Sequence, residues 1–288
     1  MTLAGRSAII TGASMGLGAA IAERFLAAGA SVMICARNAT ELESQRLRLA
    51  QSHPSARVRA HRADIAKVDQ VESLFTAAVD AFGKLDIVVN NAGVYGPMGS
   101  IETTPWAQWV EAIEINLLGA IYCCRKAVEL FRPRGYGKII NLSGGGATSP
   151  LPGLSAYAAS KAALVRFTET LALEVKDCGV DVNAIAPGTL NTRLMDQLIA
   201  AGPEKVTRAL HARMVKAQAE GGTPLEVGAD LCVYLASAAS DGLTGRLIAA
   251  QWDPWPFEAA IKQDIGGSDI YTLRRITPSD RGKGWDKT

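Results

Sequence analysis

The residues with the clearest chemical potential are a tyrosine and a lysine four positions apart, Tyr157-Ala-Ala-Ser-Lys161, with Ser143 a short loop upstream. The alanine-rich composition around them predicts a helix, in which this spacing puts both side chains on one face. A phenol with a pKa near ~10 is a poor base at neutral pH, but a nearby ammonium favours the phenolate. A serine hydroxyl could then donate to a carbonyl oxygen while the tyrosine gives or takes a proton. The spacing alone also fits a solvated helix face, so the rest of the chain has to decide.

Composition limits the classes of function. The 288 residues carry 30 basic and 28 acidic side chains, which argues against nucleic acid or a charged membrane surface as the main partner. No apolar stretch reaches the ~20 residues of a membrane helix, and the start runs into a strand pattern without room for a signal peptide. The five cysteines lack metal-ligand spacing and are typical of buried thiols in a reducing compartment, so we expect no metal and a cytoplasmic protein.

Short apolar runs alternate with helical patterns along the chain. We expect strands at 7–11, 31–36, 58–62, 85–89, 138–142, 180–185 and 246–250, and helices at 19–28, 41–51, 68–82, 106–131, 155–175 and 225–237. Strands and helices that alternate at this spacing imply a doubly wound, parallel sheet. Right-handed crossovers then place helices on both faces of the seven strands. The predicted fold class is therefore α/β.

The loop after the first strand is rich in glycine. Gly12-Ala-Ser-Met-Gly16-Leu-Gly18 stands between a strand and a helix, which is the context in which such a loop binds phosphate. Glycines permit the tight turn and let backbone amides at the helix N-terminus approach a pyrophosphate. Ligands of parallel sheets bind beyond the carboxyl ends of the strands, where Asp64 and Asn90 also fall. A glycine-rich turn that binds no ligand is the alternative.

Further motifs follow in a fixed order. Thr11-Gly12-x-x-x-Gly16-x-Gly18 precedes Asn90-Asn91-Ala92-Gly93, and then come Asn116, Ser143, Tyr157 and Lys161. The series resembles that of the short-chain dehydrogenase/reductase family, single-domain branch, over residues 6–250. The resemblance implies a Rossmann fold and a nicotinamide-dependent oxidoreductase. A single domain over residues 1–250 would carry both the cofactor and the substrate sites, and residues 251–288 would be a C-terminal extension of it.

The resemblance also implies a role for each matching residue. Tyr157 would be the general acid/base, Lys161 would lower its pKa and bind the nicotinamide ribose, and Ser143 would polarise the carbonyl. Asn116 would hold a water that links Lys161 to solvent, although a helix-interior asparagine can equally satisfy a neighbouring backbone group. Residues 193–222 would form a mobile lid over the substrate. Cofactor contacts are implied for Gly12, Ser14, Met15, Gly16, Leu17, Gly18, Arg37, Asp64, Ile65, Asn90, Ala92, Gly93, Tyr157, Lys161, Pro187, Gly188, Leu190 and Thr192.

Two stretches depart from the family pattern. Three glycines follow Ser143, where many relatives place a second serine, so the size of the substrate stays open. The usual Asp-Gly-Gly after the final strand is replaced by an aromatic stretch that contains Trp252, Trp255 and Phe257. So many aromatic side chains are rarely left in water. They either anchor a tail on the body or form a wall of the substrate pocket.

NADP is the expected cofactor. The residue that ends the second strand decides how the adenosine ribose is bound, and a carboxylate there selects NAD. This strand ends in Ala36, and the guanidinium of Arg37, which follows, can pair with a 2′-phosphate. Met15 stands where NADP-using relatives often carry a second basic residue, so NAD is the alternative cofactor. A solvated Arg37, or one stacked on adenine, would select neither.

The leading interpretation of function is hydride transfer between the cofactor and a secondary alcohol/ketone pair, as in a carbonyl reductase or alcohol dehydrogenase. A 3-oxoacyl thioester reductase is the close alternative. A cofactor-binding regulator without turnover is another, but such proteins usually lose the tyrosine or the lysine, and this chain keeps Tyr157 and Lys161. The expected partner is a small carbonyl or alcohol substrate, and the resemblance implies a homodimer or homotetramer.

Overall fold

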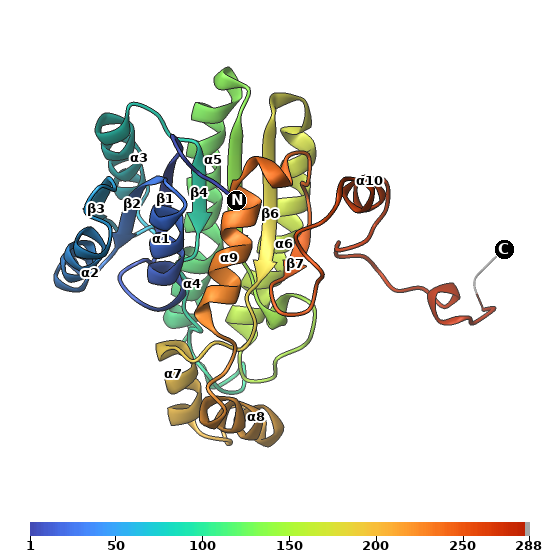
Figure 1. The fold of residues 1–288 in the computed structure, drawn as a ribbon. Coiled ribbons are helices and arrows are strands. Elements are labelled where there is room, and N and C mark those ends of the chain that lie inside the picture. The colour runs from blue at the N-terminus through green and yellow to red at the C-terminus, as the bar shows by residue number, and fades with distance from the viewer. Residues whose placement is uncertain (286–288) are drawn as a thin grey trace.

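One parallel sheet of seven strands forms the centre of the computed structural model, which describes residues 1–285 (Figure 1). The strands are β1 (Ser7–Thr11), β2 (Ser31–Ala36), β3 (Val58–Arg62), β4 (Ile87–Asn90), β5 (Gly137–Leu142), β6 (Val180–Ala186) and β7 (Leu247–Ala249). Their order is β3-β2-β1-β4-β5-β6-β7, and β1 pairs with both β2 and β4. The chain therefore changes direction across the sheet between β3 and β4, which confirms the predicted doubly wound topology.

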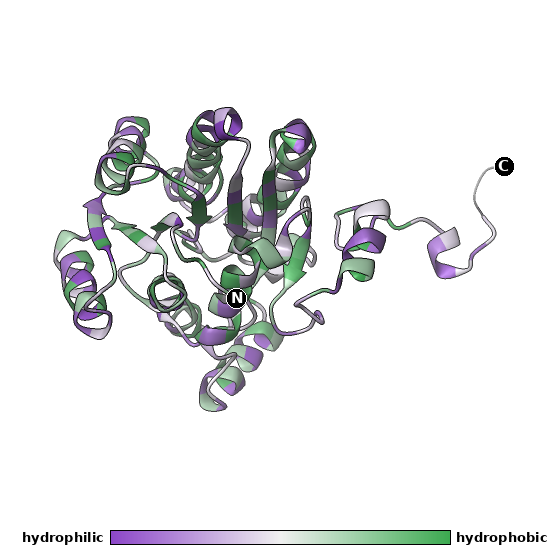
Figure 2. Ribbon diagram, turned by 45° about the horizontal axis from the view of Figure 1, so that its top comes forward, coloured by the Kyte–Doolittle hydropathy of each residue, from purple (hydrophilic) through white to green (hydrophobic). Residues whose placement is uncertain are grey.

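Helices cover both faces of the sheet. On one face lie α1 (Gly16–Ala27), α2 (Ala39–Ser52) and α9 (Leu225–Ala236). On the other face lie α3 (Val68–Phe82), α5 (Ala120–Phe131) and α6 (Ser155–Glu174). The central strands are mainly hydrophobic, whereas the helices also carry hydrophilic residues (Figure 2). This difference follows from position, because a strand of a covered parallel sheet is buried on both sides and a surface helix on one.

The predicted long helix at 106–131 is interrupted. It consists of α4 (Trp106–Ile113), a π-helical turn η1 (Glu114–Gly119) and α5. Gly119 lies so close to the β3–α3 connection that a Cβ atom there would stand 2.7 Å from the carbonyl oxygen of Ile65. Single π-helical turns are frequent at functional sites. This one contains Asn116.

Two helices occupy the stretch that was expected to form a lid. They are α7 (Arg193–Ala201) and α8 (Arg208–Ala219), and they lie together beyond the carboxyl ends of the strands (Figure 1). Met195 and Leu210 of these helices belong to an apolar cluster that also packs against Tyr157. The position is that of a cover over the candidate site, and its mobility stays a prediction.

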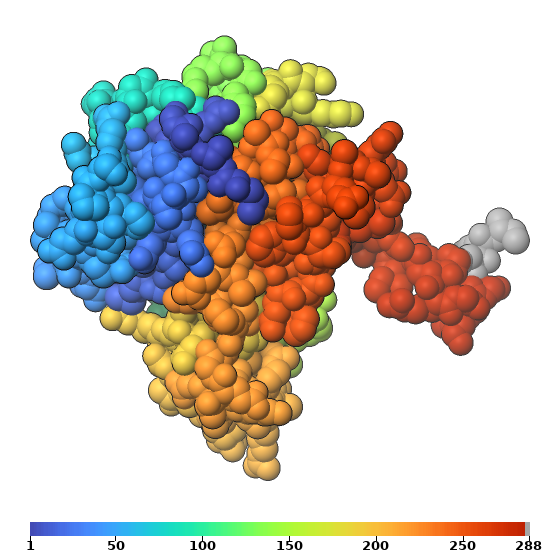
Figure 3. Space-filling view, in the orientation of Figure 1, coloured from blue at the N-terminus to red at the C-terminus, as the bar shows by residue number. Residues whose placement is uncertain are grey.

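The segment after β7 is anchored on the body by its aromatic residues. The ring of Tyr234, in α9, has its centre 6.3 Å from that of Trp255 and 6.4 Å from that of Phe257. Trp252 is exposed. Of the two interpretations, the anchor is therefore the observed one, because neither Trp255 nor Phe257 belongs to the apolar cluster around Tyr157. The segment continues through α10 (Ala259–Gly267), and its last described residues extend away from the body (Figure 3).

Four of the five cysteines are buried thiols, as their spacing in the sequence predicted. Cys35, Cys123, Cys124 and Cys232 are buried, and none of the five cysteines forms a disulfide within residues 1–285. Burial raises the pKa of the Cys35 and Cys124 thiols to about 12, so these thiols are protonated at neutral pH.

Within residues 1–285, no helix has the length and apolar character needed to cross a membrane.

Candidate active site

The glycine-rich loop is tied to the loop that follows β4. Asn91 Nδ2 donates to the carbonyl oxygens of Thr11 at 2.8 Å and of Gly12 at 3.0 Å. Gly12 has a φ of +64°, and a Cβ atom there would lie 2.7 Å from the Cα atom of Ala92. Glycine is therefore required both by the backbone and by the approach of the two loops. α1 begins at Gly16, earlier than the predicted residue 19, so its unpaired amides open directly on this loop.

The stretch after β6 lies beside the same loop. A Cβ atom on Gly16 would stand 3.5 Å from Thr192 Cγ2, and one on Gly188 would stand 2.6 Å from Thr223 Oγ1. Leu190 forms an isolated parallel bridge with Thr223. The predicted cofactor residues of both stretches, which are Gly12, Ser14, Met15, Gly16, Leu17, Gly18, Pro187, Gly188, Leu190 and Thr192, thus gather at the carboxyl edge of the sheet.

Asp64 and Ile65, at the end of β3, close the turn into α3. Asp64 Oδ1 accepts a hydrogen bond from the Ala66 amide at 3.0 Å, and the Asp64 amide donates to Gln70 Oε1 at 2.8 Å. Ile65 is buried. Both residues therefore lie at the carboxyl edge, as predicted, with the Asp64 carboxylate already holding one backbone amide.

Asn90 is directed differently from the prediction. Its side chain is 3% exposed and points into the core, where Nδ2 donates to Asn141 Oδ1 at 2.9 Å and to Cys124 Sγ at 3.2 Å. Its Oδ1 atom is buried and has no hydrogen-bond partner among residues 1–285. With the side chain committed to the core, only the backbone of Asn90 is placed to contact a cofactor.

Two guanidinium groups stand where β2 and β3 end. Arg37 is 55% exposed, and its guanidinium lies 3.9 Å from Glu111 Oε1. The Arg37 carbonyl accepts a hydrogen bond from Arg62 Nε at 3.0 Å, since Arg62 is opposite Ala36 in the strand register. Sequence reasoning missed Arg62. Arg62 could have been found only from the register of β2 and β3, which places it opposite Ala36. That register depends on pairing between segments that are distant in the sequence.

α6 presents Tyr157 and Lys161, as predicted, but their electrostatics differ from the prediction. Lys161 Nζ donates to the Leu142 carbonyl at 2.7 Å and lies 5.8 Å from the centre of the Tyr157 ring. Burial lowers the pKa of the Lys161 ammonium to about 8. Burial, and to a smaller extent Tyr95, raises the pKa of the Tyr157 hydroxyl. The net direction is therefore opposite to the predicted one, because burial of the phenol outweighs the Lys161 ammonium, which donates to a carbonyl and not to the phenol.

Ser143 and Gly144 follow β5 and face different neighbours. The Ser143 hydroxyl donates to the Lys161 carbonyl at 3.4 Å. A Cβ atom on Gly144 would lie only 2.6 Å from Tyr157 Oη. The Tyr157 hydroxyl itself makes no hydrogen bond with any residue of the described chain. The backbone position that faces this hydroxyl is therefore that of Gly144.

Asn116 is fully buried in η1. Its Oδ1 accepts from the Val94 amide at 2.8 Å, and its Nδ2 donates to the Val94 carbonyl at 2.8 Å and to Ser160 Oγ at 3.1 Å. The side chain thus satisfies backbone groups, the alternative that the sequence left open. A Cβ atom on Gly93 would lie 3.2 Å from Asn116 Oδ1 and 3.4 Å from Lys161 Nζ, so a side chain at position 93 would crowd both groups.

Comparison with known proteins assigns the family. Residues 6–202 match a family model described as short chain dehydrogenase. The chain belongs to the short-chain dehydrogenase family. It is accordingly an oxidoreductase that uses a nicotinamide cofactor to interconvert a secondary alcohol and a ketone. The fold agrees, since levodione reductase superposes with a TM-score of 0.79 at 27% identity, over 85% of this chain and 96% of that chain.

Individual relatives of this short-chain dehydrogenase differ in their named substrates. It is 39% identical to 3beta-hydroxysteroid dehydrogenase 1 of Eggerthella lenta over 247 aligned residues. The alignment covers 85% of this chain and 92% of the relative. It is also 39% identical to L-fucose dehydrogenase of Oryctolagus cuniculus over 241 aligned residues. This alignment covers 82% of this chain and 81% of the relative. One name refers to a steroid and the other to a sugar, so the relatives do not indicate one substrate class. The substrate class of this short-chain dehydrogenase has to be argued from its own residues.

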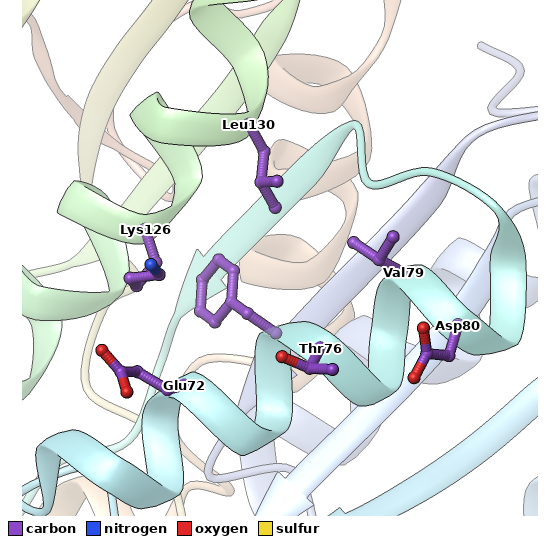
Figure 4. Close-up of a pocket in the computed structure, with 7 residues that line it drawn as sticks. Glu72, Thr76, Val79, Asp80, Lys126 and Leu130 are labelled. Atoms are coloured by element: carbon purple, nitrogen blue, oxygen red, sulfur yellow. The ribbon is translucent and has the colours of Figure 1, made fainter.

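Two hollows on this short-chain dehydrogenase differ in their distance from the predicted site. A groove of about 450 Å³ between α3 and α5 is lined by Glu72, Phe75, Thr76, Val79, Asp80, Lys126 and Leu130 (Figure 4). It contains none of the predicted site residues. A second hollow of about 270 Å³ lies between the loop after β5 and α8, and is lined by Pro150, Leu151, Pro152, Thr207, Ala209, Leu210 and Arg213. Leu151 and Leu210 also belong to the apolar cluster that packs on Tyr157, so the second hollow adjoins the site.

Proposed function

We propose that this protein is a ketone reductase or secondary alcohol dehydrogenase that prefers NADP and uses Tyr157 as its general acid/base. The carrying observation is the Tyr157 hydroxyl, which is free of hydrogen bonds within residues 1–285 and lies at the edge where the glycine-rich loop opens. A free hydroxyl at that place is available to the oxygen of a substrate. The Tyr157 hydroxyl is protonated at neutral pH, so a proton is available to the oxygen of a carbonyl being reduced; burial, which raises its pKa, also makes it a weaker acid.

The residues at the edge of the sheet fit a dinucleotide. A Cβ atom on Gly18 would lie 2.4 Å from the Gly12 carbonyl oxygen, so only glycine lets the start of α1 pack this closely on the loop. The first amides of α1 are free to bind them. When bound, the nicotinamide group supplies or accepts the hydride at the carbonyl carbon. Tyr157 gives its proton to the carbonyl oxygen in reduction and takes a proton back in oxidation.

Lys161, Asn116 and Ser143 support this proton transfer in our proposal. The Lys161 ammonium, with a pKa of about 8, is mostly charged at neutral pH and stabilises the tyrosinate that remains after proton transfer. Asn116 holds the Val94 backbone, next to Gly93, where a side chain would crowd the Lys161 ammonium. Ser143 can polarise the substrate carbonyl only after its hydroxyl leaves the Lys161 carbonyl, so its predicted role depends on a side-chain rotation.

The preference for NADP rests on Arg37. Ala36 ends β2 without a carboxylate, Arg37 is exposed beside it, and the 3.9 Å ion pair with Glu111 is long enough to be exchanged for a phosphate. Arg62, whose Nε holds the Arg37 carbonyl, adds a second positive charge that compensates for Met15. A ratio of kcat/KM for NADP over NAD well above one would support the proposal, and a ratio below one would reject it.

An apolar substrate suits the residues around Tyr157. Tyr157 packs, together with Tyr95, Met98 and Leu151, against a buried apolar cluster that includes Leu154, Met195 and Leu198. We therefore expect apolar ketones to be reduced with a higher kcat/KM than sugars of similar size. A panel of ketones, sugars and one 3-oxoacyl thioester, assayed by cofactor absorbance, tests this order. A thioester at the top of the panel would favour the alternative reductase.

The test of the mechanism is Tyr157→Phe. This change removes one hydroxyl and keeps the packed ring, so kcat should fall by at least about 10²-fold while NADP affinity stays within about twofold. An unchanged kcat would reject Tyr157 as the acid/base. If no member of the panel is turned over by the unmodified protein although NADP binds, the non-catalytic regulator becomes the better interpretation.

Assembly and location are also part of the proposal. Trp106 is 68% exposed on α4, Leu118 is 52% exposed on η1, and Leu173 is 75% exposed on α6. Large apolar side chains on these helices support contact between copies, and hence a homodimer or homotetramer. The buried, unpaired thiols fit a reducing compartment, for which we propose the cytoplasm. Light scattering of the purified protein checks the assembly, and a monomeric mass would reject it.

A further inference from the structure

Four arginine and lysine residues lie on α7 and α8, the two helices beyond the carboxyl ends of the strands (Figure 1). Three of them form ion pairs with a carboxylate, namely Arg193 with Glu41 at 3.4 Å, Arg208 with Glu204 at 3.8 Å and Lys216 with Glu220 at 3.7 Å. The fourth, Arg213, makes no ion pair and no hydrogen bond within residues 1–285. Its charge is therefore the one on these helices that no carboxylate of the described chain balances at close range.

Arg213 lines the hollow that adjoins the candidate site. This hollow has a volume of about 270 Å³, and its other lining residues are uncharged: Pro150, Leu151, Pro152, Thr207, Ala209 and Leu210. Leu210 belongs to the apolar cluster against which Tyr157 and Leu151 pack. The hollow thus combines an apolar wall that it shares with the candidate site and a single positive charge.

Tyr95 lies between Arg213 and Tyr157 in this chain of contacts. The Tyr95 ring packs edge-on against the Tyr157 ring, with the ring centres 4.8 Å apart. Burial raises the pKa of the Tyr95 hydroxyl, and the positive charge of Arg213 acts against this rise, so the guanidinium lies within electrostatic range of the phenol. Arg213 itself is exposed. Its guanidinium is therefore hydrated and can bind an anion without first losing another partner.

The chemistry of the hollow selects one kind of anion. A guanidinium pairs with a carboxylate or a phosphate through two parallel hydrogen bonds. A phosphate monoester carries a charge of about −1.5 to −2 at neutral pH, which a single arginine does not balance. A carboxylate carries one negative charge, and Arg213 is the one charged residue of the lining. The anion that fits this hollow is therefore a carboxylate.

We propose that Arg213 binds a carboxylate of the substrate, so that this protein acts on apolar ketones with a carboxylate at the end remote from the carbonyl. The inference rests on the proposed function, because it places the carbonyl at Tyr157. The apolar part of such a keto acid lies against Leu151 and Leu210, and its carboxylate pairs with Arg213 at the rim of the hollow. Arg213 is then a specificity-determining residue that takes no part in proton transfer.

The substrate experiment uses the full chain with Arg213→Gln. Arg208→Gln is the matched control, because it makes the same change on the same helix at a residue outside the hollow. The probes are straight-chain methyl ketones of increasing length that end in a carboxylate, each paired with its methyl ester.

For the best keto acid, Arg213→Gln should lower kcat/KM at least about fivefold, the effect of one charge-assisted hydrogen bond at a hydrated site. The values for the ester should stay within about twofold, as should both values with Arg208→Gln. If Arg213→Gln lowers the acid and the ester alike, or neither at any chain length, the proposal is overturned.

Calorimetric titration tests the contact without turnover. Each acid and ester is titrated into nucleotide-free protein and into protein with oxidised NADP, neither of which can reduce a ketone. Arg213→Gln should raise the Kd of the best acid at least about fivefold and leave that of its ester unchanged. An acid that does not bind, or that binds equally well to Arg213→Gln, overturns the proposal.

The two assays separate this inference from the proposed function. If the acid binds through Arg213 but no ketone is reduced, the proposed function fails and the carboxylate site stands. If ketones are reduced in a manner that depends on Tyr157 while Arg213→Gln changes neither assay, the carboxylate site alone fails.

Discussion

Lys161→Met should make the folded protein more stable although it removes a residue of the candidate site. Lys161 is 4% exposed, and burial lowers the pKa of its ammonium from 10.5 to about 8. At ~1.4 kcal/mol for each pKa unit, the charged form costs about 3 kcal/mol on folding. Methionine keeps most of the apolar stem of the side chain but leaves the Leu142 carbonyl without its hydrogen-bond donor at 2.7 Å. This loss lowers the free energy of unfolding by about 1–2 kcal/mol. A net gain of about 1–2 kcal/mol remains at pH 7, or a rise in Tm of roughly 5 °C.

The pH dependence of this gain identifies its cause. Between pH 8 and 10.5 the unfolded chain still binds the Lys161 proton and the folded chain has lost it, so the stability of the unmodified protein rises through this window. Below pH 8 both states carry the charge and the full cost is present. The advantage of Lys161→Met should therefore be largest below pH 8, vanish near about pH 9–9.5, and become a disadvantage of about 1–2 kcal/mol by pH 10.5, where only the lost hydrogen bond to the Leu142 carbonyl remains.

Chemical denaturation of the nucleotide-free protein from pH 6 to 10.5 measures this profile. Lys205→Met, which replaces an exposed lysine, is the matched control. It should give a stability difference that does not change over the same window. The reasoning is refuted if Lys161→Met is less stable than the unmodified protein at pH 7, or if its advantage is independent of pH.

Three further variants test other parts of the structure. Ser143→Ala should lower kcat less than about tenfold, because the hydroxyl bonds to the Lys161 carbonyl; a loss of about 10²–10³ would instead show that it holds the developing oxyanion. Arg37→Ala should lower kcat/KM for NADP about 10–100-fold and for NAD by less than threefold, and equal losses would reject phosphate recognition. Phe257→Ala, at a side chain 5% exposed, should cost about 3 kcal/mol in urea unfolding, whereas Trp252→Ala, 75% exposed, should cost almost nothing; equal costs would contradict the anchoring of the C-terminal segment.

The parts of this fold that local patterns determine could be predicted. Apolar runs of strand length, separated by helical periodicity, predicted all seven strands to within two residues, and the order of motifs predicted which loops meet at the carboxyl edge. The anchoring by Phe257 was one of two interpretations, since the sequence says that an aromatic residue needs cover but not which surface provides it.

The parts of the fold that depend on tertiary packing could not be predicted from the sequence. The π-helical turn at residues 114–119 accompanies the close approach of Gly119 to Ile65, a contact between separate segments. Ser143 and Gly144 are neighbours in an extended backbone, where successive side chains point to opposite sides. Which of the two faces Tyr157 therefore depends on the path of the strand into the loop, and this path is absent from the pattern of residue types.

The attachment of the C-terminal segment has a consequence for how this chain can diverge. The guanidinium of Arg246 holds the segment through the backbone carbonyls of Ser268 and Ile270, each at 2.9 Å. Every amino acid carries a carbonyl, so these two bonds place no demand on the side chains at those positions. Homologous proteins can therefore exchange residues along this part of the tail, or accept a new tail of another composition, while one arginine of the body keeps its path.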